Sequence, residues 1–174
     1  RGNRIGTVGP PIAGVEVRIE PVEGATGGEG EILIRGPGVM KGYFGNPVLT
    51  GEVLRGGWFH TGDVGRVDRD GYLTICGRSK NVIVTEAGKN IYPEEVEEHY
   101  EKCPFVKEMC VMGMPDTSGP GDTLHAIVVP DLEEFRKRSQ TSIAEMIRYE
   151  FENRSRELAS FMRIHSLAIR NEPM

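Results

Sequence analysis

The stretch from Gly57 to Glu97, GWFHTGDVGRVDRDGYLTICGRSKNVIVTEAGKNIYPEEVE, constrains the fold of this chain more than any other. Two short β-prone runs in it flank residues 68–71, Asp-Arg-Asp-Gly. Asp-Gly in such a gap predicts a hairpin, because both residues tolerate positive φ. A hairpin brings the open ends of its strands together, so we expect Asp63 and Arg78 to converge.

A second hairpin and a helix start follow in the same stretch. Residues 82–84 are β-branched, and residues 86–90 predict a turn in which Gly88 takes positive φ. Pro93 stands where a first helical residue is expected, and the glutamates after it suit the positive end of the helix dipole. The polar residues 77–80 link the two hairpins.

The remaining chain predicts a β-rich first part and a compact α+β second part. Before the central stretch we expect strands at 15–20 and 31–35, a loop at 40–47 and one helical turn at 49–54. After it we expect a helix at 93–103 whose acidic face over 94–101 is solvated, and then paired strands at 106–112 and 123–129 joined by a loop over 115–121. A short helix is expected at 132–138, and a last strand at 163–169. Between these two, Thr141 should cap a helix that buries Ile143, Ile147, Phe151 and Leu158.

Composition excludes several classes of function. The 174 residues carry a net charge of −5, most of the negative excess lies after residue 80, and no basic stripe indicates nucleic-acid binding. Three cysteines without paired spacing favour a reducing compartment, the cytoplasm, and no apolar run approaches the ~20 residues of a membrane span. Nothing indicates the oligomeric state. The polar start without methionine predicts a piece of a longer protein.

Four motifs carry a resemblance to a known family. They are Thr-Gly-Asp at 61–63, Gly-Tyr-Leu at 71–73, Gly-Arg-x-Lys at 77–80 and GKNIYPEEVE at 88–97. In this order and spacing they resemble the adenylate-forming acyl-CoA synthetase superfamily, and most of all the bacterial long-chain fatty-acid CoA ligases. Upstream, GTVGPPIAGVEVRI and GEILIRGPGVMKGYFGNP resemble the same family.

The resemblance implies a division of the chain into two parts. Residues 1–79 would be the last β-rich subdomain, a distorted barrel, of a large N-terminal adenylation domain. Residues 80–174 would be a mobile α+β lid domain with a short sheet flanked by helices, truncated before the family's catalytic lysine segment. Lys80 would be the hinge between them, although an ordinary exposed lysine explains the residue equally.

The resemblance also implies a nucleotide site. Asp63 would accept hydrogen bonds from the ribose hydroxyls, and the planar Arg78 guanidinium would reach the ribose or phosphate oxygens. Thr61, Tyr72 and Ile75 would lie nearby. The plainer alternatives are a turn aspartate, a surface arginine paired with it, and core packing for Ile75.

A second implied site receives the thiol. Gly88, Lys89 and Asn90 match the loop that approaches the pantetheine channel, where glycine allows a close approach to ligand. A simple hairpin turn is the alternative for Gly88. The four histidines are scattered without the spacing of a metal site, so no metal ligand is predicted in the chain.

The implied function is that of an ATP-dependent acid–thiol ligase. It would use Mg²⁺ and ATP to activate a small carboxylic acid, a fatty acid in the narrower resemblance, as an acyl-adenylate with release of pyrophosphate. Coenzyme A would then take the acyl group and release AMP. The family's phosphate loop and terminal lysine are absent, so no catalytic residue is assigned and the chain alone is expected to be inactive. Transfer to a carrier-protein thiol and a non-catalytic interaction module with this fold are the alternatives.

Overall fold

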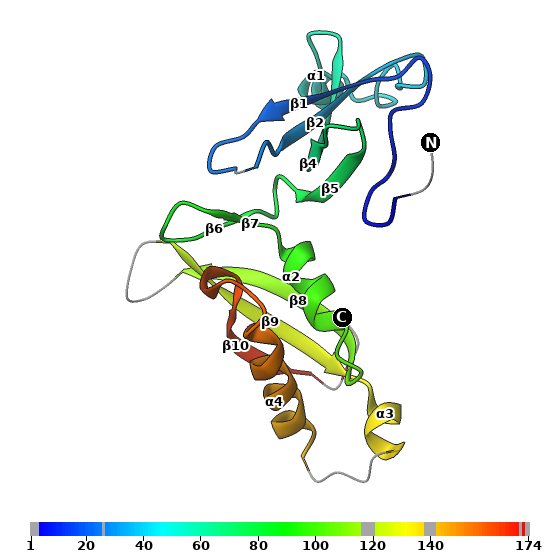
Figure 1. The fold of residues 1–174 in the computed structure, drawn as a ribbon. Coiled ribbons are helices and arrows are strands. Elements are labelled where there is room, and N and C mark those ends of the chain that lie inside the picture. Colours follow the sequence, from blue (N-terminus) through cyan, green and yellow to red (C-terminus); the bar gives the residue numbers. More distant parts are fainter. Residues whose placement is uncertain (1–3, 26, 116–120, 138–141, 171, 173–174) are drawn as a thin grey trace. The chain divides into compact units, whose positions relative to one another are not determined.

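A computed structural model describes residues 4–25, 27–115, 121–137, 142–170 and 172 of the chain (Figure 1). Contacts within the chain divide it into two compact units, Arg1–Asn81 and Val82–Met174, called unit 1 and unit 2. Strands dominate unit 1, and unit 2 combines a small sheet with helices, so the predicted α+β class is confirmed. No helix among the described residues is long and apolar enough to cross a bilayer.

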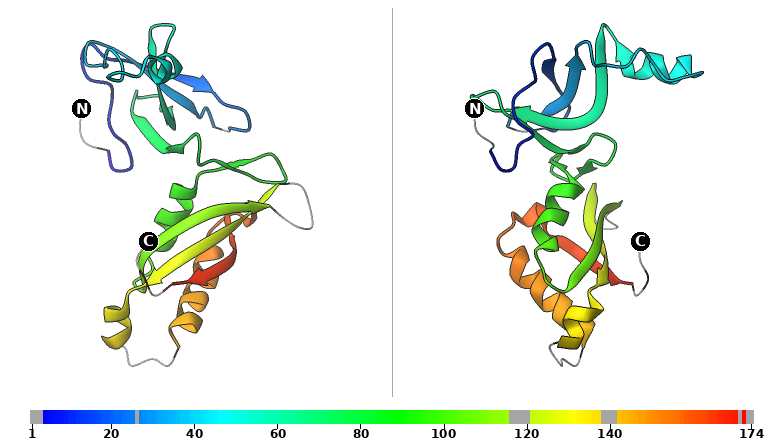
Figure 2. Two further views of the ribbon diagram at one scale, coloured as in Figure 1. Left: turned by 180° about the vertical axis from the view of Figure 1, so that it is seen from behind. Right: turned by 90° about the vertical axis from the view of Figure 1, so that its right-hand side faces the viewer.

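Unit 1 is built on a five-stranded antiparallel sheet in which β1, β2, β4 and β3 are successive neighbours and β5 also pairs with β4. The strands are β1 (Glu16–Pro21), β2 (Gly30–Arg35), β3 (Leu54–Arg55), β4 (Trp58–Val67) and β5 (Leu73–Arg78). Strand β4 bends along its length and curls the sheet (Figure 2). Strands at 15–20, 31–35, 63–67 and 72–76 are confirmed, but β4 begins earlier than expected, at Trp58.

The turn between β4 and β5 follows the prediction. Gly71 has a φ of +83° and donates its N–H to the Asp68 carbonyl at 3.0 Å. The Asp68 carboxylate accepts from the backbone N–H groups of Asp70 and Tyr72, each at 2.9 Å. These bonds close the turn and fix the pairing next to it, Val67 with Leu73; the register then shifts by one residue between Val64 and Gly65, and Asp63 pairs with Arg78 at the open end.

Helix α1 (Pro47–Val53) begins earlier than the sequence suggested. The expected loop through Pro47 is wrong, because Pro47 is the first helical residue. The side chain of Asn46 caps the helix by accepting from the Leu49 N–H at 3.0 Å. Proline suits the first helical position because it lacks an N–H that would otherwise need a partner.

Unit 2 contains a two-stranded hairpin, a three-stranded sheet and several helices. The hairpin pairs β6 (Ile83–Val84) with β7 (Asn90–Ile91). The sheet has the order β10-β9-β8, with β9 (Asp122–Pro130) antiparallel to β8 (Val106–Pro115) and parallel to β10 (Ile164–Ile169). The helices are α2 (Pro93–Glu101), α3 (Leu132–Lys137), α4 (Ile143–Ser155) and the short 3-10 helix η1 (Ser160–Met162).

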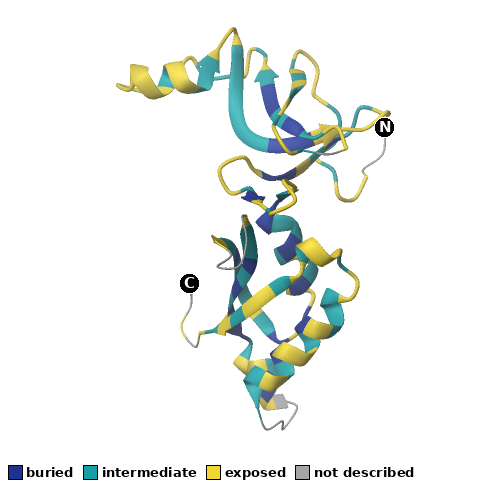
Figure 3. Cartoon of the chain, turned by 90° about the vertical axis from the view of Figure 1, so that its left-hand side faces the viewer, coloured by how far each residue is buried: buried dark blue, intermediate teal, exposed yellow. Residues whose placement is uncertain are grey.

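The core of unit 2 lies between the sheet and one layer of helices. Helices α2 and α4 lie on the same face of the sheet (Figures 1 and 2). The rings of Tyr100 and Phe151 stack there with centroids 4.6 Å apart, and Figure 3 shows buried residues where the helices meet the strands. The predicted buried face of α4 is confirmed for Ile147 and Phe151, which are buried, and for Ile143, which packs against the core. Leu158 also packs against the core but lies beyond the end of α4 at Ser155.

Three local expectations in unit 2 need correction. Ser142, not Thr141, caps α4, and its hydroxyl accepts from the Glu145 N–H at 3.4 Å. Thr141 lies outside the described residues. Residues 116–120 of the predicted loop between the paired strands also lie outside them. Helix α2 starts at Pro93 as predicted but ends at Glu101. Its acidic face is not wholly solvated, because Glu97 is half-buried and accepts from the Val111 N–H at 2.6 Å.

Candidate functional site

Asp63 and Arg78 meet at the open end of the β4–β5 hairpin. They are partners in the strand register, and Arg78 Nε lies 3.1 Å from Asp63 Oδ1. The Arg78 side chain is 59% exposed and that of Asp63 is 32% exposed, so both are accessible to a ligand. An exposed pair of this kind adds about 0–1 kcal/mol to stability, so the pair is not needed to hold the fold. The predicted convergence is confirmed.

Thr61 has a role in the backbone beside this pair. Its hydroxyl donates to the Ile32 carbonyl at 2.8 Å and accepts from the Asp63 N–H at 3.0 Å. Its own carbonyl accepts from Arg78 Nη1 at 3.3 Å. Thr61 therefore links β2, Asp63 and Arg78.

An open hollow of about 480 Å³ in unit 1 adjoins these residues. Its lining includes Glu31, His60, Thr61, Gly62, Arg78 and Lys80. Two of the predicted nucleotide residues and the predicted hinge residue thus line the same hollow. The positive side chains of Arg55, Arg78 and Lys80 suit an anionic ligand, and Glu31 and Glu52 are the acidic residues of the lining.

The structure does not bring Tyr72 and Ile75 to this hollow. Tyr72 lies at the turn end of the hairpin, where the Arg4 guanidinium stands 4.9 Å from its ring centre. Ile75 lies opposite Gly65 in the middle of the hairpin and is 49% exposed. The expectation that Ile75 packs in the core is therefore wrong.

Lys80 lies at the end of unit 1, just before the division between Asn81 and Val82. Its side chain is exposed, and the backbone turns there because the Asn81 N–H donates to the Arg78 carbonyl at 3.1 Å. Its assignment as a hinge remains a prediction.

The loop from Thr85 to Lys89 joins β6 to β7 in unit 2. Gly88 has a φ of +68°, and its N–H donates to the Thr85 carbonyl at 2.8 Å. Lys89 accepts from the Thr85 N–H at 3.0 Å through its carbonyl. Asn90 then starts β7. The predicted turn with a left-handed glycine is confirmed, and the assignment of Gly88, Lys89 and Asn90 to a thiol site remains a prediction.

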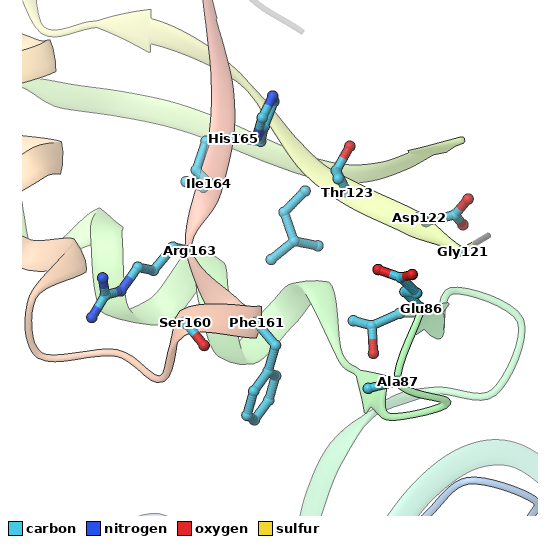
Figure 4. A pocket seen from close by; sticks show the side chains of 12 residues that line it. Glu86, Ala87, Gly121, Asp122, Thr123, Ser160, Phe161, Arg163, Ile164 and His165 are labelled. Carbon is cyan, nitrogen blue, oxygen red and sulfur yellow. The ribbon is translucent and has the colours of Figure 1, made fainter. Parts of the chain in front are cut away.

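A cavity of about 380 Å³ opens beside this loop (Figure 4). Glu86 and Ala87 of the loop lie across from the segment that carries Phe161, Arg163 and His165. The Lys89 ammonium lies 4.3 Å from the centre of the Phe161 ring, a cation–π distance. The cavity therefore combines an aromatic side chain with basic residues and with the acidic residues Glu86 and Asp122, and sequence reasoning did not identify it.

Strand pairing also assembles a group that sequence spacing could not reveal. Glu20, Glu31 and His60, on three neighbouring strands, each place one possible ligand atom within 4.8 Å of the others. Two of these side chains are close to arginines: Arg18 pairs with Glu20 at 2.7 Å, and Arg55 lies 3.0 Å from His60 Nδ1. Positive charge from Arg18 and Arg55 therefore already faces two of the three potential ligand side chains.

Comparisons with known proteins identify the family of the chain. The family described as AMP-binding enzyme matches residues 1–44, and the AMP-binding enzyme C-terminal domain matches residues 95–172. The chain belongs to the AMP-binding enzyme family. The predicted resemblance to adenylate-forming acyl-CoA synthetases is confirmed.

Two curated relatives of this family differ in the acid that their names indicate. Feruloyl-CoA synthase from Amycolatopsis sp. is 46% identical over 132 residues, which cover 73% of the chain and 26% of the relative. The long-chain-fatty-acid–CoA ligase from Bacillus subtilis is 41% identical over 131 residues, covering 73% and 23%. The chain thus spans about a quarter of the length of these AMP-binding enzymes.

A solved structure of the family has the same fold over nearly the whole chain. It is o-succinylbenzoate CoA synthetase from Bacillus subtilis in complex with its acyl-adenylate intermediate, with a TM-score of 0.79 and 29% identity. The alignment covers 97% of the chain and 33% of the synthetase. The same synthetase with ATP and magnesium matches with a TM-score of 0.77, 29% identity and the same coverage.

Proposed function

We propose that the whole protein is an AMP-forming acyl-CoA synthetase. The observation that carries the proposal is the accessible Asp63–Arg78 pair, 3.1 Å apart, with Arg78 lining the hollow of unit 1. In the proposed site the Asp63 carboxylate accepts from both ribose hydroxyls, and the Arg78 fork donates to ribose or phosphate oxygens. The nucleotide would replace part of a weak surface pair, so little stability is lost on binding.

The proposed reaction has two steps. A carboxylate oxygen of the acid attacks the α-phosphorus of ATP, the bond to pyrophosphate breaks, and an acyl-adenylate forms. The thiolate of coenzyme A then attacks the acyl carbon, and AMP leaves with the carboxylate oxygen. Mg²⁺ would accompany ATP, held mainly through the phosphates. None of the residues in this chain is assigned the family's charge-stabilising lysine, so the chain alone is predicted to be inactive.

Rotation about Lys80 would exchange the adenylation and thioester-forming arrangements. In the second arrangement the Gly88 loop would border the thiol channel. The contact between Lys89 and Phe161 supports the assignment, because the ammonium offers a positive group and the ring, which lines the cavity beside this loop, offers a flat apolar face; Glu86 and Asp122 also line this cavity. Such a surface suits the phosphates and base of coenzyme A.

A fatty acid is the proposed substrate, as in the Bacillus long-chain ligase. The similarity to feruloyl-CoA synthase favours an aromatic acid as the second candidate. The proposed location is the cytoplasm, and the three free cysteines agree with a reducing compartment.

The test is ATP–pyrophosphate exchange by the whole protein with short, medium, long-chain and aromatic acids, with and without coenzyme A. We expect exchange that depends on one acid class, and acyl-CoA and AMP after the thiol is added. Loss of exchange in Asp63→Ala protein would tie the activity to this site. No exchange by folded protein with any acid would contradict the proposal, and AMP release by the 174-residue chain alone would contradict its predicted inactivity.

A further inference from the structure

Strand β4 contains a bulge at the residues that lead into Asp63. In the β2–β4 register, Leu33 lies opposite His60 and Glu31 lies opposite Val64. Ile32 alone therefore faces the three residues 61–63. A bulge of this kind interrupts the ladder of backbone hydrogen bonds and redirects the side chains on the bulged strand. Its N–H groups need other acceptors, because an unpaired buried donor costs about 1–3 kcal/mol.

Side chains supply those acceptors. Glu31 Oε1 accepts from the Gly62 N–H at 3.2 Å, and the Thr61 hydroxyl accepts from the Asp63 N–H at 3.0 Å. Gly62 has a φ of +73°, a conformation that favours glycine, so the chain bends sharply at this point. Asp63 thus follows a bend whose amide is held by a carboxylate from the neighbouring strand.

Glu31 is itself held in place. Its second oxygen, Oε2, lies 3.0 Å from Nδ1 of His60, and the two side chains are only 18% and 12% exposed. The Gly62 carbonyl accepts from the Ser79 N–H at 2.9 Å, which ties the bulge to the residue that follows Arg78. The Glu31 carboxylate therefore holds the amide of Gly62, the residue before Asp63, and the carbonyl of Gly62 in turn binds the residue after Arg78.

We propose that Glu31 is a positioning residue for the nucleotide site. It holds the 61–63 bulge so that Asp63 and Arg78 face the ribose together. The role of Glu31 in nucleotide binding rests on the proposed function, whereas its hydrogen bond with the Gly62 amide does not. The two parts of the inference can therefore be tested separately.

The first readout is hydrogen exchange of the Gly62 amide in the whole protein. Glu31→Ala removes the acceptor, and we expect this amide to exchange at least about tenfold faster. Glu31→Gln keeps an acceptor oxygen and should restore slow exchange. Glu29→Ala is the matched control, because Glu29 is 14% exposed and pairs with Arg66 at 2.8 Å instead. An unchanged Gly62 exchange rate in Glu31→Ala protein, with the fold intact, overturns the inference.

The second readout is ATP–pyrophosphate exchange by the whole protein in the presence of the carboxylic acid substrate. We expect Glu31→Ala to raise the KM for ATP about tenfold with a smaller change in kcat, and Glu31→Gln and Glu29→Ala to stay within about twofold of the native enzyme. If Asp63→Ala raises this KM and Glu31→Ala does not, positioning is refuted and the proposed function stands. If the native protein shows no ATP–pyrophosphate exchange with any carboxylic acid, the proposed function fails. Hydrogen exchange of the Gly62 amide then decides by itself whether Glu31 holds the bulge.

Discussion

Arg78 contacts two residues of β4: its Nε forms an ion pair with the carboxylate of Asp63, and its Nη1 donates to the carbonyl of Thr61. The first contact measures 3.1 Å and the second 3.3 Å. The backbone contact orients the guanidinium even when Asp63 is engaged elsewhere. A ligand can therefore take the Asp63 carboxylate while Arg78 stays in place.

This arrangement predicts that Asp63→Ala weakens ATP use without unfolding the protein. A hydrogen bond to a charged group contributes about 1.5–3 kcal/mol, so the KM for ATP should rise about 10- to 100-fold. Stability should fall by less than about 1 kcal/mol, because the ion pair is exposed. Steady-state kinetics and thermal unfolding of the same variant check both parts. An unchanged KM for ATP would show that Asp63 does not bind the ribose.

The hairpins and helix starts could be predicted because their signals are local. Asp-Gly at 70–71 and the left-handed Gly88 specify turns within four residues, and Pro93 followed by glutamates specifies a helix start. The hairpin brings Asp63 and Arg78 to the same end, although their direct pairing also needs the one-residue register shift between Val64 and Gly65. These inferences needed no knowledge of the tertiary fold.

The bulge and its partners could not be predicted, because they depend on pairing between distant segments. Glu31 and Gly62 are 31 residues apart, and only the β2–β4 register brings them together. Ile75 looks like a core residue by type, yet its place on the curled sheet leaves it half exposed. Asn46 and Pro47 were expected in a loop but cap and start helix α1, because helix caps and loops use the same residue types.

Lys80→Pro should impair thioester formation more than adenylation in the whole protein. Proline fixes φ near −65°, which obstructs a rotation that the proposed hinge must absorb. We expect acyl-CoA formation to fall about tenfold more than ATP–pyrophosphate exchange. Lys80→Ala, which removes the charge but keeps the backbone free, is the control. Equal losses in both steps with Lys80→Pro would indicate misfolding rather than a blocked hinge.

Gly88→Ala should weaken coenzyme A use selectively. Gly88 has a φ of +68° and open space around it, so an added methyl group strains the backbone by about 1–2 kcal/mol without a clash. The loop should shift, and the KM for coenzyme A should rise while the rate of ATP–pyrophosphate exchange stays unchanged. Gly14→Ala is the matched control, since Gly14 has a φ of +80° and equally open surroundings in unit 1. A similar rise in the control would rule out a specific role for the Gly88 loop.

Glu97 gives unit 2 a stability that depends on pH. Burial raises the pKa of the Glu97 carboxyl, although the Val111 N–H donates to it at 2.6 Å and opposes the shift. The neighbouring charges of Glu94 and Glu101 raise this pKa further. A carboxyl whose pKa is higher in the folded state ionises more easily in the unfolded chain. Its contribution therefore favours folding at low pH and is lost as the pH rises through the folded pKa.

Glu97→Gln should remove the decrease in folding stability that ionisation of Glu97 causes as the pH rises. Glutamine keeps an oxygen that can accept from the Val111 N–H, but it never ionises. We expect the variant to unfold at a higher temperature than the native chain near neutral pH, and the difference to shrink as the pH approaches ~4, where an unperturbed glutamate is protonated. Circular dichroism of thermal unfolding over a pH series measures this. Glu98→Gln, at an exposed position on the same helix, removes an equal charge and should change little. Lower stability of Glu97→Gln at neutral pH would mean that the ionised carboxylate gains more from the Val111 hydrogen bond than it loses through burial.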